Sequence, residues 1–347
     1  ETPLQNSVDA NGLSMLSSTQ AYEITVKWQD ETLLTPRARA GAAATTTEGV
    51  LTITSADGRI RFQTDDLIRT PANEVVRVTG YGTTADTLLI SRAYAGSSGA
   101  SIASADVLVG IGSAPVEGAD PAAARAVDRT ERTNYTQIFG PYAVQVSGSA
   151  NAIRKYGLMG TEFDHQLGNR IKEAGVAFDQ ALLYGKSTLD TTSSPRRAMD
   201  GMISFITTNV DSSSTSLTET LLLNQLQSCF DAGGNPNRIV VGSKQKRVIS
   251  AFTSFGTIQV MRPDSERGLV VDTYKSDFGQ CAVVLDRWCR TQDLFIFNRD
   301  QAEIATLRPL TFTPLAKTGD ADKGMVVQEK SLRFRRQRHS ARFSALT

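Results

Sequence analysis

The sequence predicts a mixed α+β protein, and three observations lead to that prediction. Apolar side chains recur every three or four positions over residues 162–184, which indicates one long amphipathic helix. Short strand-like runs fill residues 48–115, and helical and strand-like patterns alternate over residues 200–300. Because 347 residues exceed the usual size of one domain, we expect two or three structural regions.

The first 47 residues show little continuous periodicity. Thr35 and Pro36 precede Arg37, Arg39 and an Ala/Thr-rich run, and this composition is typical of extended or flexible chain. A disordered tail explains the same composition equally well.

Residues 48–115 change to short strands with a period of two. The dipeptide Asp57-Gly58 lies between the runs 50–54 and 59–63, which predicts a β-hairpin. Further strands are expected at 74–79, 87–94 and 107–111. About five short strands at this spacing predict a small barrel or a twisted sheet with a modest core of its own.

Residues 119–158 are expected to hold a polar helical piece at 121–132 and two strand-like runs, at 134–139 and 142–147. The long helix then follows Thr161, a suitable N-cap, with Glu162 and Asp164 in its first turn, where negative charge suits the helix dipole. Gly185 is a natural C-cap.

The alternation over residues 200–300 predicts a small sheet flanked by helices. It follows a Ser/Thr/Pro-rich linker at 187–197. Thr218 is expected to cap a helix that ends at Gly233-Gly234, before a buried strand at 238–242 and a second helix at 244–252.

Composition excludes several classes of protein. The chain carries 37 Lys and Arg against 36 Asp and Glu, a net charge of +1, which argues against a dedicated nucleic-acid-binding module. Its three cysteines, Cys229, Cys281 and Cys289, form no C-x-x-C pair, so free thiols in a reducing cytoplasm are expected. Since no apolar run approaches the about 20 residues that span a bilayer, we expect no membrane partner.

No catalytic, metal-binding or cofactor-binding constellation is predicted, and the chain is not expected to be an enzyme. Glu162, Asp164 and His165 lie in one helical turn, but adjacent side chains point apart, which favours a solvated helix start. The phrase Asp277-Phe278-Gly279 has neither the glycine-rich loop nor the H-R-D motif that would accompany it in a kinase.

Several phrases together resemble one family. Residues 276–279 (S-D-F-G) precede an apolar strand and D-R-W at 286–288, and L-A-K-T-G-D at 315–320 and E-K-S-L-R-F-R at 329–335 follow. This combination resembles the major capsid proteins of tailed bacteriophages with the Hong Kong 97-type fold. The runs E-V-V-R-V-T-G at 74–80 and D-T-L-L-I-S-R-A-Y at 86–94 resemble an enlarged extended loop in one branch of that family, and N-Y-T-Q-I-F at 134–139 resembles the phrase before its long helix.

The resemblance implies five regions along the chain. An N-terminal arm (1–47) is followed by an extended loop with a β-rich, barrel-like insertion (48–118). A peripheral domain (119–199) with a spine helix at 162–184, an axial α/β domain (200–300) and strands that return to the peripheral domain (301–347) complete the chain. The resemblance places S-D-F-G and A-K-T-G-D at turns that redirect strands between the axial and peripheral domains.

The resemblance also implies a function. Copies of the chain would assemble, in the cytoplasm of a host bacterium, into the hexamers and pentamers of an icosahedral virion capsid around double-stranded DNA. Portal, scaffold and decoration proteins are the further partners that it implies. One alternative is the shell of an encapsulin-type nanocompartment with enzyme cargo. A remote one is an α/β hydrolase or transferase with a β-module, for which two histidines make poor candidates.

If the chain is a capsid protein, its basic side chains are the candidate residues for contact with DNA or with another subunit. They are Arg170 and Lys172 on the long helix and Arg333, Arg335, Arg336 and Arg338 near the C-terminus. The competing interpretation, which we favour for the C-terminal group, is an exposed or edge strand whose charges discourage wrong pairing or meet carboxylates of the next subunit. Leu332 and Phe334 then share one face, and Arg333 and Arg335 the other. For Arg170 and Lys172, a solvated helix face explains the pattern equally well.

Overall fold

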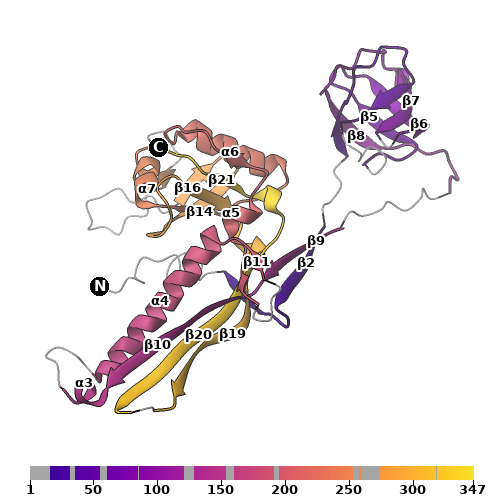
Figure 1. Cartoon of the computed structure of the whole chain (residues 1–347). Coiled ribbons are helices and arrows are strands. Elements are labelled where there is room, and N and C mark those ends of the chain that lie inside the picture. Colours follow the sequence, from indigo (N-terminus) through magenta and orange to yellow (C-terminus); the bar gives the residue numbers. More distant parts are fainter. Residues whose placement is uncertain are drawn as a thin grey trace. The chain divides into compact units, whose positions relative to one another are not determined.

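The computed structural model describes residues 16–31, 36–54, 61–84, 86–120, 129–153, 160–190, 195–252, 258–259, 273–317 and 319–347. The described residues form a mixed α/β structure that is rich in strands and has few helices (Figure 1). Contacts divide the chain into two compact units. The smaller unit is Glu31–Thr130, and the larger one combines Glu1–Asp30 with Glu131–Thr347.

The smaller unit contains a closed β-barrel. Its strands lie in the order β3-β8-β5-β6-β7-β4, and every pair of neighbours is antiparallel. An antiparallel bridge between Ala40 and Ile53 joins the two ends of this order, which closes the sheet. The strands are β3 (Arg37–Arg39), β4 (Val50–Thr52), β5 (Asp66–Arg69), β6 (Val75–Tyr81), β7 (Thr87–Ser91) and β8 (Val107–Ser113).

The barrel has its own hydrophobic core, as the sequence predicts. Phe62, Ile68, Leu88 and Leu108 are fully buried in it. A Leu or Phe side chain removed from water in this way contributes about 1.5–3 kcal/mol. The strand predicted at 87–94 ends earlier, at Ser91, and a short 3-10 helix, η2 (Tyr94–Gly96), follows.

The predicted hairpin is wrong in its partner strand. The first run, β4, pairs with β7 instead of residues 61–63, which lie outside any strand. This pairing places Leu51 opposite Leu88, and both side chains are fully buried. The burial of these two facing side chains therefore decides which strand pairs with β4. The predicted turn at 55–58 and residues 59–60 lie outside the described residues.

The described part of the first 47 residues is not a disordered tail. It contains β1 (Ser17–Gln20), β2 (Thr25–Glu31) and the barrel strand β3. The polar helix predicted at 121–132 is also wrong where it is described, because Arg129–Tyr135 forms strand β9 and pairs with β2 in a two-stranded ribbon. An ion pair between Lys27 and Glu131 (3.3 Å) supports this pairing. Residues 121–128 lie outside the described part.

The first sheet of the larger unit has the order β1-β19-β20-β10. Its long strands are β10 (Gln137–Ser147), β19 (Ala302–Leu315) and β20 (Ala321–Phe334), and β20 pairs antiparallel with both of its neighbours. Helix α4 (Glu162–Tyr184) runs along β10 and β20 (Figure 1). A short helix, α3 (Gly148–Ala152), precedes it.

The long helix has the predicted bounds and caps. Thr161 and Asp164 form a capping box, and the backbone N–H of Gly185 donates to the Ala181 carbonyl at 2.9 Å. Phe178 lies edge-on to Phe139 of β10, with ring centroids 5.3 Å apart. The apolar stripe of the helix is thus buried against the sheet, as its periodicity predicts.

Strand β19 has a partly open outer edge. Strand β1 covers Glu303–Thr306, and no other described strand pairs with the rest of that edge. Pro309 and Pro314 lie in this open stretch, along with exposed Leu310 and Leu315.

The second sheet of the larger unit is mixed and has the order β13-β21-β18-β14-β17-β16-β15. The predicted strand at 238–242 and the two predicted helices are confirmed, and Thr218 caps its helix by accepting the Leu221 N–H at 3.3 Å. The elements are β13 (Val210–Asp211), β14 (Arg238–Val241), β15 (Ile258–Gln259), β16 (Thr273–Ser276), β17 (Gly279–Leu285), β18 (Leu294–Phe297), β21 (Ala341–Phe343), α5 (Met202–Phe205), α6 (Glu219–Asp231) and α7 (Ser243–Ser250).

Short elements complete the larger unit. They are β11 (Thr188–Leu189), β12 (Arg197–Ala198), η3 (Arg299–Gln301) and η4 (Gln337–His339). The phrase S-D-F-G joins β16 to β17, with Ser276 opposite Gly279, and Gly279 adopts a positive φ of 130°. The described residues of A-K-T-G-D lie between β19 and β20. Both phrases are therefore turns between strands, but each joins two antiparallel strands of the same sheet, so the prediction that they redirect the chain between two domains is wrong. Among the described residues, no helix has the length and apolarity to cross a membrane.

Candidate interaction surfaces

The basic side chains on α4 are partly neutralised within the helix. Arg170 forms an ion pair with Glu173, three residues later, and both side chains are partly exposed. Lys172 is half-buried. An exposed ion pair of this kind contributes about 0.3–0.5 kcal/mol, which is too little to fix the Arg170 side chain in one position.

Arg333 and Arg335 converge on one carboxylate of the same chain. Their guanidinium groups lie 3.3 Å and 3.2 Å from Oε2 of Glu303, which stands opposite Arg333 in the β19–β20 register. Leu332 and Phe334 point to the buried face, so the predicted alternation of faces is confirmed. The predicted edge position is wrong, because β20 is an inner strand that pairs with β19 on one side and with β10 on the other. The carboxylate partner that the sequence assigns to a neighbouring subunit is present here within one subunit.

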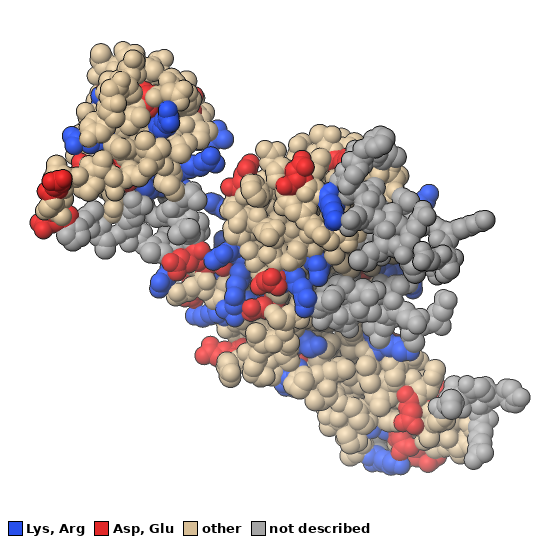
Figure 2. All heavy atoms as spheres, turned by 180° about the vertical axis from the view of Figure 1, so that it is seen from behind, with Lys and Arg blue, Asp and Glu red and all other residues tan. Residues whose placement is uncertain are grey.

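Arg336 and Arg338 have exposed side chains next to η4. Their backbones are fixed, because the Arg336 N–H donates to Asp30 Oδ2 at 3.2 Å and Asn209 Nδ2 donates to the Arg338 carbonyl at 2.7 Å. The sequence thus brings Arg333–Arg338 together along one segment, and no described contact joins this segment to Arg170 or Lys172. On the face that Figure 2 shows, blue and red side chains are interspersed.

Sequence reasoning misses a buried carboxylate at the centre of the first sheet. Glu329 of β20 is 3% exposed and accepts hydrogen bonds from Thr136 Oγ1 (2.9 Å), from Arg308 Nε (2.9 Å) and from Arg197. Three donors offset the cost of removing the charge from water. Glu329 therefore ties β12, β19 and the residue that joins β9 to β10 to β20. Its place in E-K-S-L-R-F-R is the only sequence signal for it.

The phrase N-Y-T-Q-I-F also makes long-range contacts. Asn134 Nδ2 donates to the Leu332 carbonyl at 2.7 Å, and Asn134 Oδ1 accepts the Asp200 N–H at 2.8 Å. Gln137 Oε1 accepts the Met199 N–H at 3.1 Å. Asn134 and Gln137 thus hold the chain that follows α4 against this sheet.

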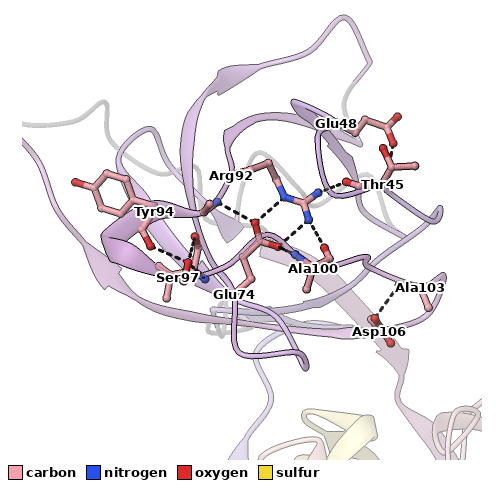
Figure 3. Close-up of polar contacts among 11 residues, drawn as sticks. Thr45, Glu48, Glu74, Arg92, Tyr94, Ser97, Ala100, Ala103 and Asp106 are labelled. Carbon is pink, nitrogen blue, oxygen red and sulfur yellow. Dashed lines mark hydrogen bonds and ion pairs between the residues drawn. The ribbon is translucent and has the colours of Figure 1, made fainter.

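The barrel has a buried ion pair of its own, which Figure 3 shows. Glu74 is fully buried, and its carboxylate accepts Arg92 Nε at 2.8 Å and Nη2 at 2.7 Å, with further bonds from the N–H groups of Ala93 and Ala100. Arg92 also donates to the Thr45 carbonyl at 2.6 Å. Burial by itself raises the pKa of Glu74, but the Arg92 hydrogen bond and the two backbone N–H groups outweigh it, so the pKa lies below its usual value.

The described titratable residues do not assemble into a reactive centre. Burial raises the pKa of each cysteine thiol to about 12, so all three are protonated and unreactive. His165 contacts Asn169, and His339 contacts Gln301. A cavity of about 270 Å³ between the β2–β9 ribbon and α5 has no histidine or cysteine in its lining. No group of three or more His, Cys, Asp or Glu side chains is placed to hold a metal ion in the described part of the chain.

Three solved structures illustrate the likeness of the fold. A chain from Microbacterium phage Oxtober96 matches with a TM-score of 0.53 at 9% identity, over 99% of this chain and 92% of that one. A chain from Mycobacterium phage Bobi gives 0.49 at 10% identity, over 98% and 90%. The holo-SrpI encapsulin complex from Synechococcus elongatus PCC 7942 gives 0.42 at 10% identity, over 63% and 78%. The first of these supports a shared fold and nothing beyond it, and the two below 0.5 support no further argument.

The family is decided by the sequence as a whole. No curated protein matches the chain. The family model of the SU10 major capsid protein matches residues 1–347, which is the full length of the sequence. The resemblance that the motifs suggest is therefore correct, and a capsid family assembles from copies of one chain. The chain belongs to the SU10 major capsid protein family and is the major capsid protein of a phage.

Proposed function

We propose that this chain assembles into the hexamers and pentamers of an icosahedral phage head that encloses double-stranded DNA, and that assembly takes place in the host cytoplasm. The match of the family model over residues 1–347 is the observation that carries the proposal. The role is structural and involves no catalytic step. Portal, scaffold and decoration proteins are its further partners in this proposal.

The finer architecture is that of the Hong Kong 97-type fold. The sheet with α4 corresponds to a peripheral domain with its spine helix, and the seven-stranded sheet corresponds to an axial domain. Residues 1–47 correspond to the arm, although their strand β3 is part of the barrel. Residues 48–118 form the extended loop with its insertion, and 301–347 return to the peripheral domain. The order of β10, α4, the second sheet and the β19–β20 pair along the chain supports this assignment.

Packaged DNA is held by weak contacts that do not depend on sequence. The net charge is +1, and the shared partner Glu303 makes Arg333 and Arg335 less available to phosphates. Arg336 and Arg338 are the strongest candidates because their side chains are exposed, and Arg170 and Lys172 are secondary ones.

The test is electron microscopy and nuclease protection of particles assembled from the whole chain. We expect closed shells built from hexamers and pentamers, and nuclease-resistant double-stranded DNA within particles from infected cells. Shells that enclose an enzyme and no DNA would identify a nanocompartment instead. A chain that remains monomeric under all assembly conditions would contradict the proposal.

A further inference from the structure

One outer side of the barrel carries an array of arginines. In the order β3-β8-β5, Arg37 of β3 and Arg69 of β5 both stand opposite Val109 of β8, one on each side of it. Arg39 stands opposite Val107, two residues further along the same pair of strands, so it lies on the same outward face as Arg37. With strands about 4.8 Å apart and about 3.3 Å between residues, the backbones of the three arginines lie roughly 7–12 Å from one another.

These arginines have no acidic partner among the described residues. All three residues are exposed, and the described hydrogen bonds of Arg37 and Arg39 involve backbone carbonyls. Arg39 Nη1 donates to the Ala105 carbonyl at 3.3 Å, and the Arg37 carbonyl accepts Arg61 Nη1 at 3.0 Å. By contrast, Arg77 and Arg92 in the same barrel pair with Asp65 and Glu74.

Apolar side chains lie between and beside the arginines. Val107 is 39% exposed and Ile111 50% exposed, on the same outward side of β8. Arginine is enriched at the energetic centre of protein–protein interfaces, and exposed aliphatic side chains beside it gain free energy when a partner removes them from water. Phosphate contacts alone would not need the exposed aliphatic residues.

A short segment of the same unit has the complementary character. It follows β8 at residues 115–120, where Glu117 and Asp120 are exposed and make no described ion pair. Val116, beside them, is 70% exposed. The segment thus offers two carboxylates and one aliphatic side chain. The array offers three guanidinium groups and two aliphatic side chains, so the two surfaces are complementary in charge.

We propose that residues 115–120 of one copy dock on the Arg37/Arg39/Arg69 side of the barrel of a second copy. This inference rests on the proposed self-assembly and names one contact within it. Two different patches of one chain meet in it, so the contact is heterologous, and heterologous contacts generate closed rings when the rotation between copies fits. Opposite charges orient the copies, and the aliphatic residues are removed from water. Repetition around a ring makes many weak contacts sufficient.

Intermolecular disulfide formation tests the contact directly. Copies with Val109→Cys and copies with Val116→Cys are mixed, assembled and oxidised. The three native cysteines are buried and do not interfere. We expect a cross-linked dimer of the two variants in shells and none in unassembled subunits. The control replaces Val109→Cys with Leu89→Cys on β7, which is more exposed than the half-buried Val109 and lies outside the β3-β8-β5 array. Equal cross-linking of the control, or no cross-link in intact shells, would overturn the proposal.

Charge reversal is the second test. Arg37→Glu with Arg69→Glu is expected to lower the yield of shells at least tenfold, while Arg37→Lys with Arg69→Lys retains it. The barrel core is untouched, so thermal unfolding of the unassembled chain stays unchanged. Adding Glu117→Arg and Asp120→Arg to the Glu variant is expected to restore assembly. Failure of this rescue would overturn the contact and would favour another acidic partner, such as nucleic acid.

The two proposals fail in distinguishable ways. If the unsubstituted chain forms no shells, the proposed function is wrong. If it forms shells and the reversed variant does so with the same yield, the proposed function stands and the docking contact is wrong.

Discussion

The barrel and the larger unit differ in how far apart in the sequence their paired strands lie. In the barrel, β5, β6 and β7 follow one another and pair in that order. In the larger unit, Ser17 pairs with Glu303 and Gln137 with Lys330. Pairs that are close in sequence need little loop-closure entropy, whereas distant ones need the whole chain. The barrel is therefore expected to be self-sufficient, and the larger unit depends on both ends of the chain.

Separation of the two units gives the largest expected effect. A fragment of residues 31–130 is expected to fold, because its core and its Glu74–Arg92 pair are complete within it. Deleting residues 321–347 removes β20 and β21 and is expected to unfold the larger unit while the barrel remains folded. Amide NMR spectra measure both results. A fragment with the narrow amide dispersion of an unfolded chain would break the comparison.

Loss of the buried carboxylate in the barrel comes next. Glu74→Ala leaves the Arg92 guanidinium buried without its partner and is expected to cost about 3–5 kcal/mol of barrel stability. The matched control is Glu48→Ala, whose exposed carboxylate accepts only the Thr45 N–H in the described contacts, and whose loss is expected to cost less than about 1 kcal/mol. Denaturant unfolding of the 31–130 fragment measures the difference, and equal losses would contradict the role of the pair.

The same carboxylate predicts a pH dependence for the barrel. The pKa of Glu74 is lower in the folded state than its usual value of 4.5. Its stabilising contribution is therefore present above that value and is lost as the pH falls through the lowered folded-state pKa. Glu74→Gln should remove this loss.

A buried carboxylate in the larger unit predicts the opposite pH dependence. Asp286 is fully buried, and burial raises its pKa to about 6, although the Trp288 N–H donates to its Oδ1 at 2.9 Å. A raised carboxyl pKa means that stability falls as the pH rises from about 4 to above 6. Asp286→Asn keeps an acceptor and is expected to add about 2 kcal/mol at pH 8 and nothing at pH 4.

Thermal unfolding at the two pH values measures the effect of Asp286→Asn. Asp300→Asn, at an exposed site, serves as the control and is expected to change stability by less than about 0.5 kcal/mol at either pH. A stability gain at pH 4 as large as that at pH 8 would show that ionisation of Asp286 is not its cause.

Local signals made parts of the fold predictable from sequence. Helix α4 begins and ends where Thr161 and Gly185 predict, because caps and an apolar stripe act within a few residues. Pairing over longer distances was not predictable. The Asp57-Gly58 signal gave β4 the wrong partner, since the match of Leu51 with Leu88 inside the barrel outweighs it.

The contact residues follow the same rule. The basic residues near the C-terminus can be read from the sequence, but their partner Glu303 depends on the β19–β20 register. The Arg37–Val109–Arg69 row likewise depends on the order β3-β8-β5, which no local pattern specifies. Sequence therefore identified which side chains are available, and strand register decided which of them meet.

The prolines in β19 have a consequence for the chain before any shell exists. A long strand edge with free N–H groups recruits strands from other molecules and leads to aggregation. Pro309 and Pro314 have no N–H to offer in the stretch that β1 leaves uncovered. Newly made subunits must reach high concentration without adding strands to one another at random. These two residues help to keep the unassembled chain soluble, so that copies join through side chains instead of through an unprotected backbone edge.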